Sequence, residues 1–93
     1  RGIIEMNKKL ITEKLMAILK ENTVMIIDDE NIKEDTDFIE ELGFDSLSII
    51  RFITDVEREF NIEFDFEELV SEVIGKYGTL LEVIEKKLNK EQD

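Results

Sequence analysis

The side chains that most often do chemistry in proteins are absent from this chain, because it contains no cysteine and no histidine. Ser-His and Cys-His nucleophile systems are therefore excluded, together with thiolate and imidazole metal sites. Disulfide bonds are excluded as well. The composition argues against intrinsic catalysis, and any thiol or thioester chemistry would need an added cofactor.

One serine nevertheless stands where a group could be attached. The run Glu-Leu-Gly-Phe-Asp-Ser-Leu, which ends at Leu47, places Ser46 after a glycine turn and at the first turn of a helix. Unpaired backbone N–H groups and the positive end of the helix dipole lie there, so this position tolerates a phosphate. The neighbouring Asp45 would repel that phosphate. Its use is then to cap the helix, or to position a metal in a modifying enzyme.

A serine that only caps a helix has the same local sequence as a serine that carries a group. The residues after Ser46 are therefore needed to distinguish the two roles. At about 100° per residue, the apolar residues of this helix gather on one face. That core face is formed by Ile49, Phe52, Ile53, Val56 and Phe60. The outer side carries Leu47, Arg51, Thr54, Asp55 and Arg58. A leucine beside the serine and outside the core indicates either a partner contact or an isolated surface leucine.

Helical periodicity predicts the elements that position this serine. The first helix should span about 7–20, with an apolar face of Leu10, Ile11, Leu15, Ile18 and Leu19. The second should begin at Ser46 and end near Phe60, with Asp45 as its N-cap. A short third helix fits about 66–74, with Asp65 and Glu68 as a capping box. The fourth should start after Gly78 with the capping box Thr79 and Glu82. Its buried face should comprise Leu80, Leu81, Val83, Ile84 and Leu88.

The connection from Glu21 to Asp45 is long for a small domain, so it needs its own anchors. Those anchors are expected to be Val24, Ile26, Ile27, Ile32, Phe38, Ile39 and Leu42, with a helical turn near 38–42. No segment alternates with the period of a strand. The expected fold is all-α: a small antiparallel bundle of three main helices plus one short helix, with a long loop between the first and second helices. At 93 residues, one domain spanning 1–93 is expected.

Acidic residues dominate the charge: 24 acidic against 12 basic residues give a net charge of −12. The segment 21–45 alone carries ten acidic residues and one basic residue, a net −9. Such a chain should repel nucleic acid and anionic membranes and attract basic partner surfaces. No apolar run is long enough for membrane insertion, and no secretory signal is visible. We expect a cytoplasmic monomer, with Met6 as a candidate native start and residues 1–5 then outside the native chain.

Taken together, the order and spacing of these pieces resemble the acyl carrier protein family over nearly the whole chain. The resemblance includes the first helix, the long acidic loop, the run from Phe38 to Leu47, the helix ending Val-Glu-Arg-Glu-Phe at Phe60, then Ile-Glu-Phe at 62–64 and the last helix with Thr79. It implies that Ser46 carries a covalent 4′-phosphopantetheine, transferred from coenzyme A by a phosphopantetheinyl transferase that uses Mg²⁺. It also implies that the chain is not an enzyme and presents acyl thioesters to acyl-loading and acyl-transferring enzymes of fatty-acid, lipid or polyketide biosynthesis.

In this family the second helix and the preceding loop form the docking surface. The resemblance therefore implies partner contacts at Phe44, Leu47, Ser48, Arg51, Thr54, Asp55 and Arg58. Ser48 and Arg51 stand where carriers of primary fatty-acid synthesis usually have acidic residues, Thr54 replaces an exposed apolar residue, and Arg58 interrupts a later acidic run. These differences leave an aminoacyl or peptidyl carrier open as an alternative to the acyl carrier.

Two other classes of function compete. One is calcium binding, because Asp29, Asn31 and Glu40 fall at positions one, three and twelve of an EF-hand-like loop. Lys33 and Glu34 stand where that loop needs a ligand and a glycine, which argues against it. The other is an acidic helical interaction module without a prosthetic group, in which Ser46 only caps its helix.

Overall fold

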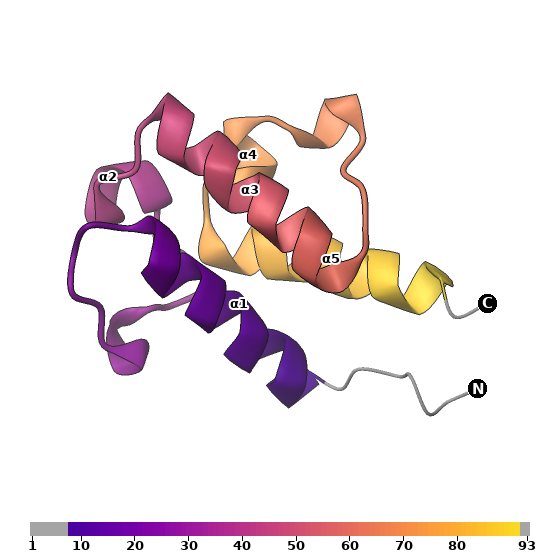
Figure 1. Ribbon diagram of the computed structural model, residues 1–93, viewed down its shortest axis with the longest axis horizontal. Coiled ribbons are helices and arrows are strands. Elements are labelled where there is room, and N and C mark those ends of the chain that lie inside the picture. Colours follow the sequence, from indigo (N-terminus) through magenta and orange to yellow (C-terminus); the bar gives the residue numbers. More distant parts are fainter. Residues whose placement is uncertain (1–7, 92–93) are drawn as a thin grey trace.

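The computed structural model describes residues 8–91, and within them the chain is helical, as predicted (Figure 1). The three long helices are α1 (Lys8–Asn22), α3 (Ser46–Phe60) and α5 (Tyr77–Glu91). The connections contain the short helices α2 (Phe38–Leu42) and α4 (Ser71–Ile74) and the 3₁₀ turns Asp29–Asn31 and Phe66–Glu68. Helix α1 runs antiparallel to α3 and packs against both α3 and α5. The predicted bundle with its long first connection is confirmed.

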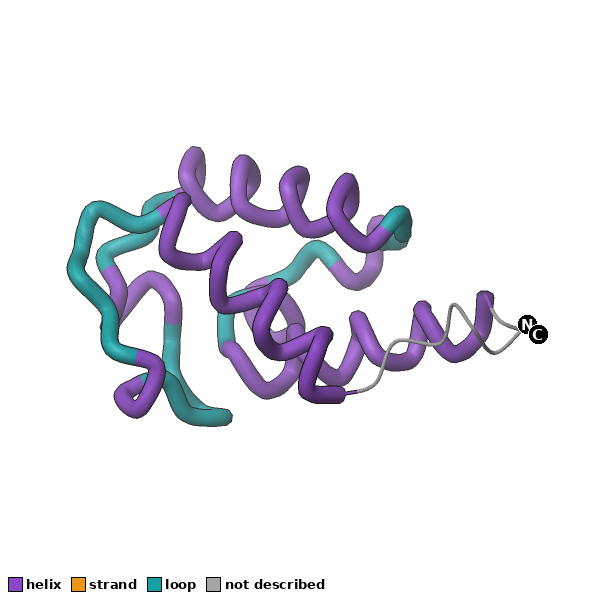
Figure 2. Tube along the Cα trace, turned by 60° about the horizontal axis from the view of Figure 1, so that its bottom comes forward, coloured by secondary structure: helices purple, strands orange, loops and turns teal. Residues whose placement is uncertain are grey.

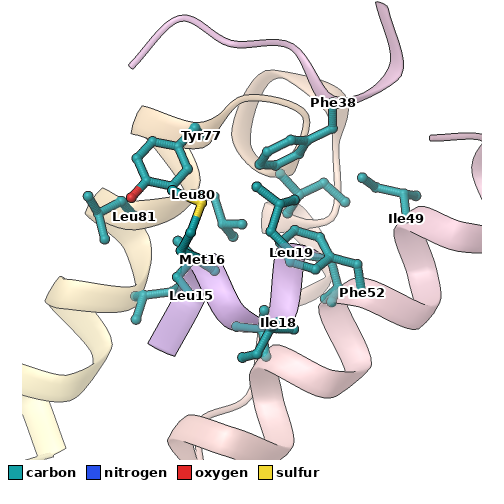
Figure 3. Close-up of a cluster of buried hydrophobic side chains, with 14 of the residues drawn as sticks. Leu15, Met16, Ile18, Leu19, Phe38, Ile49, Phe52, Tyr77, Leu80 and Leu81 are labelled. Carbon is teal, nitrogen blue, oxygen red and sulfur yellow. The ribbon is translucent and has the colours of Figure 1, made fainter. Parts of the chain in front are cut away.

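The long helices enclose one apolar core, to which each contributes an amphipathic face. Figure 3 shows side chains of α1, α3 and α5 meeting there, with Phe38 from α2 among them. The predicted core face of α3 is confirmed, since Ile49, Phe52, Ile53, Val56 and Phe60 are all buried. Of the predicted face of α5, Leu80, Leu81 and Ile84 are buried, and Val83 and Leu88 pack at its edge.

Three phenylalanine rings fix the approach to α3. Phe38, Phe44 and Phe52 are at most 3% exposed, and their ring centroids lie 5.3–5.7 Å apart. Phe38 and Phe52 meet edge to face at 80°, a favoured aromatic geometry. Because these rings come from α2, the turn and α3, they hold the start of α3 in place. Truncation of a buried phenylalanine to alanine costs about 3–5 kcal/mol.

Helix α1 differs in detail from its prediction. It extends to Asn22, because the Asn22 side-chain amide donates to the Ile18 carbonyl at 2.9 Å and to Asp55 Oδ2 at 3.0 Å. The predicted start at Asn7 lies outside the described residues. Leu10 is 40% exposed, so its placement in the core was wrong, and Met16 is buried on that face.

The loop between α1 and α2 crosses the end of the bundle opposite to the start of α1 and the end of α5 (Figure 2). Its predicted anchors are only partly right: Phe38 and Leu42 are buried and Ile27 and Ile32 are half-buried. Val24, Ile26 and Ile39 were wrong, with exposed fractions of 97%, 98% and 46%. In an extended stretch of chain, successive side chains point to opposite sides. The apolar residues of such a run therefore do not all reach the core.

Backbone hydrogen bonds do the anchoring that those side chains do not. The Phe38 N–H donates to the Gly75 carbonyl at 2.9 Å, and the Tyr77 N–H donates to the Thr36 carbonyl at 3.0 Å. The Thr36 side chain is buried, and its hydroxyl accepts from the Lys33 N–H at 2.7 Å. The loop is therefore fixed to the junction between α4 and α5.

The region after α3 is less regular than predicted. In place of one helix over 66–74, the chain forms the 3₁₀ turn Phe66–Glu68 and then α4. The exposed Leu69 and Val70 separate the two parts, and Val70 is extended. The predicted capping box of Asp65 and Glu68 is present at the 3₁₀ turn, where Glu68 Oε1 accepts from the Asp65 N–H at 2.7 Å.

Helix α5 begins at Tyr77, so the predicted start after Gly78 and the capping box of Thr79 were wrong. The Thr79 hydroxyl instead donates backward, to the Val73 carbonyl at 2.7 Å. Gly78 is the second residue of the helix, and its N–H donates to the Glu34 carbonyl at 2.8 Å. This hydrogen bond brings the loop against α5. Across residues 8–91, no helix has both the length and the apolar character needed to cross a membrane.

Candidate functional site

A left-handed glycine creates the turn that leads to Ser46. Gly43 ends α2 with φ of 76°, a conformation that glycine adopts at little cost. The Phe44 N–H then donates to the Phe38 carbonyl at 3.1 Å, and the Phe44 ring is buried. The chain therefore turns sharply and presents Asp45 and Ser46 at the surface.

Asp45 and Ser48 form a reciprocal capping box at the start of α3, which confirms Asp45 as the N-cap. Asp45 Oδ1 accepts from the Ser48 N–H at 2.8 Å, and Ser48 Oγ accepts from the Asp45 N–H at 2.9 Å. The hydrogen bonds from Ser48, its backbone N–H first and its hydroxyl next, hold the pKa of Asp45 below its usual value. The Asp45 carboxylate therefore stays ionised while it caps the helix.

Ser46 lies between these two residues and its side chain takes no part in the cap. It is exposed, and its hydroxyl makes no hydrogen bond within the described residues. A phosphate on that oxygen would feel the positive end of the dipole of α3, a helix of 15 residues. It would not receive the Ser48 N–H, because Asp45 already occupies that donor. The arrangement fits a phosphate diester that points into solvent with its oxygen on Ser46.

An apolar cavity of about 420 Å³ opens beside Ser46, between α3 and the segment 69–75. It is lined by Ile39, Ser46, Ile49, Ile50, Ile53, Thr54, Glu57, Leu69, Ser71, Ile74 and Gly75. Sequence reasoning did not find this cavity. The only signal for it was Ile50, which is apolar, lies outside the core face of α3 and is 61% exposed. A hydroxyl on the wall of an apolar cavity can tether a group whose tail lies inside it.

The outer side of α3 carries most of the residues predicted to meet partners. Leu47 is 66% exposed, as expected from the helical geometry, and Arg51, Thr54 and Arg58 are exposed near it. Asp55 is half-buried, and its carboxylate pairs with Arg58 at 3.3 Å and accepts from the Asn22 amide. Leu47, Arg51, Thr54 and Arg58 together form a continuous exposed strip, which we call the α3 strip.

Two of the predicted contact residues have structural roles. Phe44 is 3% exposed and packs against Phe38 and Phe52, so its ring is not available to a partner, and that part of the prediction was wrong. Ser48 is half-buried, and both its N–H and its hydroxyl are used by the capping box.

The calcium hypothesis finds no geometric support. Asp29 and Asn31 lie in a 3₁₀ turn, whereas Glu40 lies in α2. Among the residues that the structure describes, no group of three or more acidic side chains is arranged to hold a metal ion. The EF-hand spacing in the sequence does not produce a site in the fold.

Comparison with known proteins agrees with this geometry. Residues 13–85 match the family described as the phosphopantetheine attachment site. The acyl carrier protein of Thermotoga maritima is 32% identical over 82 residues, which cover 88% of this chain and 96% of that protein. The acyl carrier protein of Buchnera aphidicola subsp. Acyrthosiphon pisum is 37% identical over 87 residues, or 94% of each chain. That of Clostridium acetobutylicum is 35% identical over 75 residues, or 81% and 92%.

The family match covers the turn at Gly43, the capped start of α3 with its exposed serine, and every helix that lines the apolar cavity. Neither an aminoacyl carrier nor a module without a prosthetic group is favoured by these relatives. The chain belongs to the acyl carrier protein family and is an acyl carrier with a covalent 4′-phosphopantetheine.

Proposed function

We propose that Ser46 is the residue to which the 4′-phosphopantetheine is attached. One observation supports this assignment above the others: the Ser46 side chain is exposed to a modifying enzyme and also lines the apolar cavity. When bound, the group supplies the thiol that this cysteine-free chain lacks, and that thiol holds an acyl group as a thioester. Ser46 Oγ would hold the phosphate, and the dipole of α3 would stabilise its charge.

The cavity favours an acyl group over an aminoacyl group as cargo. Six of its lining side chains are isoleucine or leucine: Ile39, Ile49, Ile50, Ile53, Leu69 and Ile74. Removing a hydrocarbon tail from water is favourable by about 0.8 kcal/mol for each buried CH₂ group, whereas a charged amine would lose its hydration. The cavity residues therefore shield an acyl tail and leave bond making and breaking to partner enzymes.

We further propose that partner enzymes, including the phosphopantetheinyl transferase, dock on the α3 strip. Leu47 offers an exposed apolar contact beside Ser46, and Arg51 and Arg58 offer two positive charges on a chain whose net charge is −12. The acidic loop would speed the encounter with a basic partner, whereas the strip would set the register of docking. Close contacts of Arg51 and Arg58 then require carboxylates or hydrogen-bond acceptors on the partner.

The attachment proposal is tested by intact-mass measurement after incubation with coenzyme A, Mg²⁺ and a broad-specificity phosphopantetheinyl transferase. The wild-type chain should gain one phosphopantetheinyl group, and Ser46→Ala should gain none. Ser71→Ala is the matched control, because Ser71 is an exposed serine that lines the same cavity. A mass gain that persists in Ser46→Ala, or that is absent from the wild type with several transferases, overturns the assignment.

The docking proposal is tested by the rate of the same modification. Leu47→Ala and Arg51→Glu should lower kcat/KM for the chain as substrate, and Lys9→Glu should not. Lys9→Glu makes the same change of charge on an exposed residue at the start of α1, away from Ser46. Equal rates for all three variants would place docking elsewhere.

A further inference from the structure

Lys87 of α5 forms an ion pair with the segment that leads into one wall of the cavity. Its Nζ lies 2.8 Å from Glu68 Oε1 and 3.9 Å from Asp65 Oδ2, and it sits 5.7 Å from the centre of the Phe64 ring. Its side chain is only 17% exposed. We call Lys87, Glu68 and Asp65 the Lys87 clamp. The clamp joins the middle of α5 to the connection between α3 and α4, which Figure 1 shows passing beside α5.

The clamped segment has few apolar anchors of its own. Phe64 is buried and its N–H donates to Glu57 Oε2 at 2.9 Å, which fixes the beginning of the segment. Phe66 is 88% exposed, and Leu69 and Val70 are 44% and 42% exposed, so none of the three is fully buried. Segments with few buried apolar contacts open at low free energy, and a charge pair then has a large share in holding them closed.

The segment leads directly into the cavity wall. Leu69 and Ser71 line the cavity, and they follow Glu68 by one and three residues. The other wall comes from α3, whose position is fixed by its fully buried residues Phe52 and Val56. The width of the cavity therefore depends on the position of the segment 69–71, and the Lys87 clamp contacts the chain directly before that segment.

We propose that Lys87 is a positioning residue for the acyl group: through Glu68 it keeps the Leu69 wall closed over the tail and so protects the thioester from water. This inference rests on the proposed attachment at Ser46. Lys87 touches neither the attachment site nor the cavity, and it acts through the chain between Glu68 and Leu69. Asp65, at 3.9 Å and 72% exposed, adds little to the pair.

The first test compares thioester lifetimes in neutral hydroxylamine for the octanoyl and the acetyl forms of the loaded protein. An acetyl group offers the apolar cavity a single methyl group and an octanoyl group offers a whole chain, so the ratio of the two lifetimes measures shielding of the tail. Lys87→Met keeps the aliphatic stem beside Phe64 and removes only the charge. We expect it to reduce the ratio about fivefold, which corresponds to about 1 kcal/mol at tenfold per 1.4 kcal/mol. Lys86→Met, an exposed neighbour in α5, should leave the ratio unchanged.

The second test uses the unmodified chain, so its result does not depend on the attachment proposal. Amide hydrogen exchange over residues 65–71 should be about fivefold faster in Lys87→Met than in the wild type, and unchanged in Lys86→Met. Glu68→Gln should resemble Lys87→Met, because its amide oxygen can still accept from the Asp65 N–H. The double variant should be no faster than either single variant, as expected when both act through one contact.

A lifetime ratio unchanged in Lys87→Met overturns the proposal, as does unchanged exchange over residues 65–71. An equal fall in both lifetimes identifies a purely structural role and also overturns it. Failure of the mass gain described above would overturn the attachment at Ser46, and the exchange measurement would still decide whether the clamp holds the segment.

Discussion

Asp45 and Ser48 hold each other at the start of α3, each accepting a hydrogen bond from the backbone N–H of the other, at 2.8 and 2.9 Å. Ser46 stands between them with its backbone fixed and its hydroxyl free of hydrogen bonds in the described structure. The two roles that a serine can have at a helix start are therefore divided between Ser46 and Ser48. Ser48 caps the helix, and the Ser46 hydroxyl stays free for the attachment that we propose.

This division predicts that two alanine variants differ in stability. Ser48→Ala should lower the free energy of unfolding by about 0.5–1.5 kcal/mol, because it leaves the Asp45 N–H without its acceptor. Ser46→Ala should change it by less than about 0.5 kcal/mol, as is usual at surface positions. Urea unfolding of the unmodified chain measures both. If Ser46→Ala proves the more destabilising of the two, the division of roles is wrong.

The Asp45 carboxylate predicts a dependence on pH. Hydrogen bonds from Ser48 hold its pKa below the usual 3.8 in the folded chain, whereas the unfolded chain has the usual value. A carboxyl group with a lowered folded pKa contributes stability above the unfolded pKa and loses it as pH falls through the folded pKa. The contribution of Asp45 should thus be complete above about pH 5 and decline as pH falls from 3.8 through the lower folded pKa.

Asp45→Asn isolates this contribution, because an amide oxygen can still accept at the cap without a charge to titrate. The difference in unfolding free energy between wild type and Asp45→Asn should be larger at about pH 7 than at about pH 3. Denaturant unfolding at the two pH values measures it. Asp37→Asn, at the N-cap of α2, serves as a comparison at another capped helix. A difference that is the same at both pH values would contradict the assigned hydrogen bonds.

The sequence predicted that α3 begins at Ser46 and ends near Phe60, and both are confirmed, because local signals agree there. Asp45 is a strong N-cap, the apolar period is regular, and Asn61 ends the helix in a left-handed conformation. Only four of the seven anchors predicted for the loop were right, because the loop is irregular and has no helical period that separates buried from exposed residues. Its true anchors, such as the bond from the Phe38 N–H to Gly75, join backbones far apart in sequence and leave no side-chain pattern.

The same distinction applies to the site. The positions of Asp45, Ser46 and Leu47 at the exposed start of α3 could be predicted because turn and helix geometry are local. The cavity and the Lys87 clamp depend on how the segment 64–75 folds over α3 and against α5, and that path followed from neither the capping residues nor the apolar period. Phe44 was misassigned for a related reason: its burial depends on Phe38 and Phe52 rather than on its neighbours.

Gly78 was read in the sequence as a helix boundary, and the structure gives it a different role with its own prediction. A Cβ at this position would lie 2.8 Å from the Glu34 carbonyl oxygen. Gly78→Ala should therefore push the loop away from α5 and cost about 1–3 kcal/mol, although alanine favours helices. Thermal unfolding measures the loss. A stabilised Gly78→Ala variant would show that the loop is not held against α5 in solution.

The ionisation of Tyr77 predicts how the stability of the fold changes at alkaline pH. Burial, followed by the nearby Asp29 and Glu85 carboxylates, raises the pKa of its hydroxyl above the usual 10.0, against a hydrogen bond with Thr12 that lowers it. Because the pKa of the hydroxyl is higher in the folded chain than in the unfolded chain, the contribution of Tyr77 to stability is complete below pH 10.0. It is lost as pH rises through the folded pKa. Tyr77→Phe should be less sensitive to pH above 10 than the wild type. Unfolding of both chains, monitored by circular dichroism across that pH range, measures the difference. Parallel curves of stability against pH for the wild type and Tyr77→Phe would contradict the prediction.

The acidic loop predicts that salt stabilises the fold. Segment 21–45 has a net charge of −9 and contains the exposed run Asp28, Asp29 and Glu30. Within the described residues, the ammonium group of Lys20 pairs with Asp29. Added salt screens this repulsion, and it also weakens the few ion pairs, such as Lys14 with Glu59 at 2.7 Å. Because acidic residues outnumber basic ones two to one, repulsion should dominate.

We therefore expect the melting temperature to rise by several degrees between about 20 mM and 500 mM NaCl, since about 1 kcal/mol corresponds to about 4–8 °C in a domain of this size. Millimolar Mg²⁺ should act in the same direction at lower concentration, because a divalent ion neutralises neighbouring carboxylates more effectively. Asp28→Asn should reduce this dependence more than Glu63→Gln, which removes an exposed charge outside the loop. A melting temperature that responds to neither salt nor Mg²⁺ would show that the loop carboxylates are far enough apart for water alone to screen them.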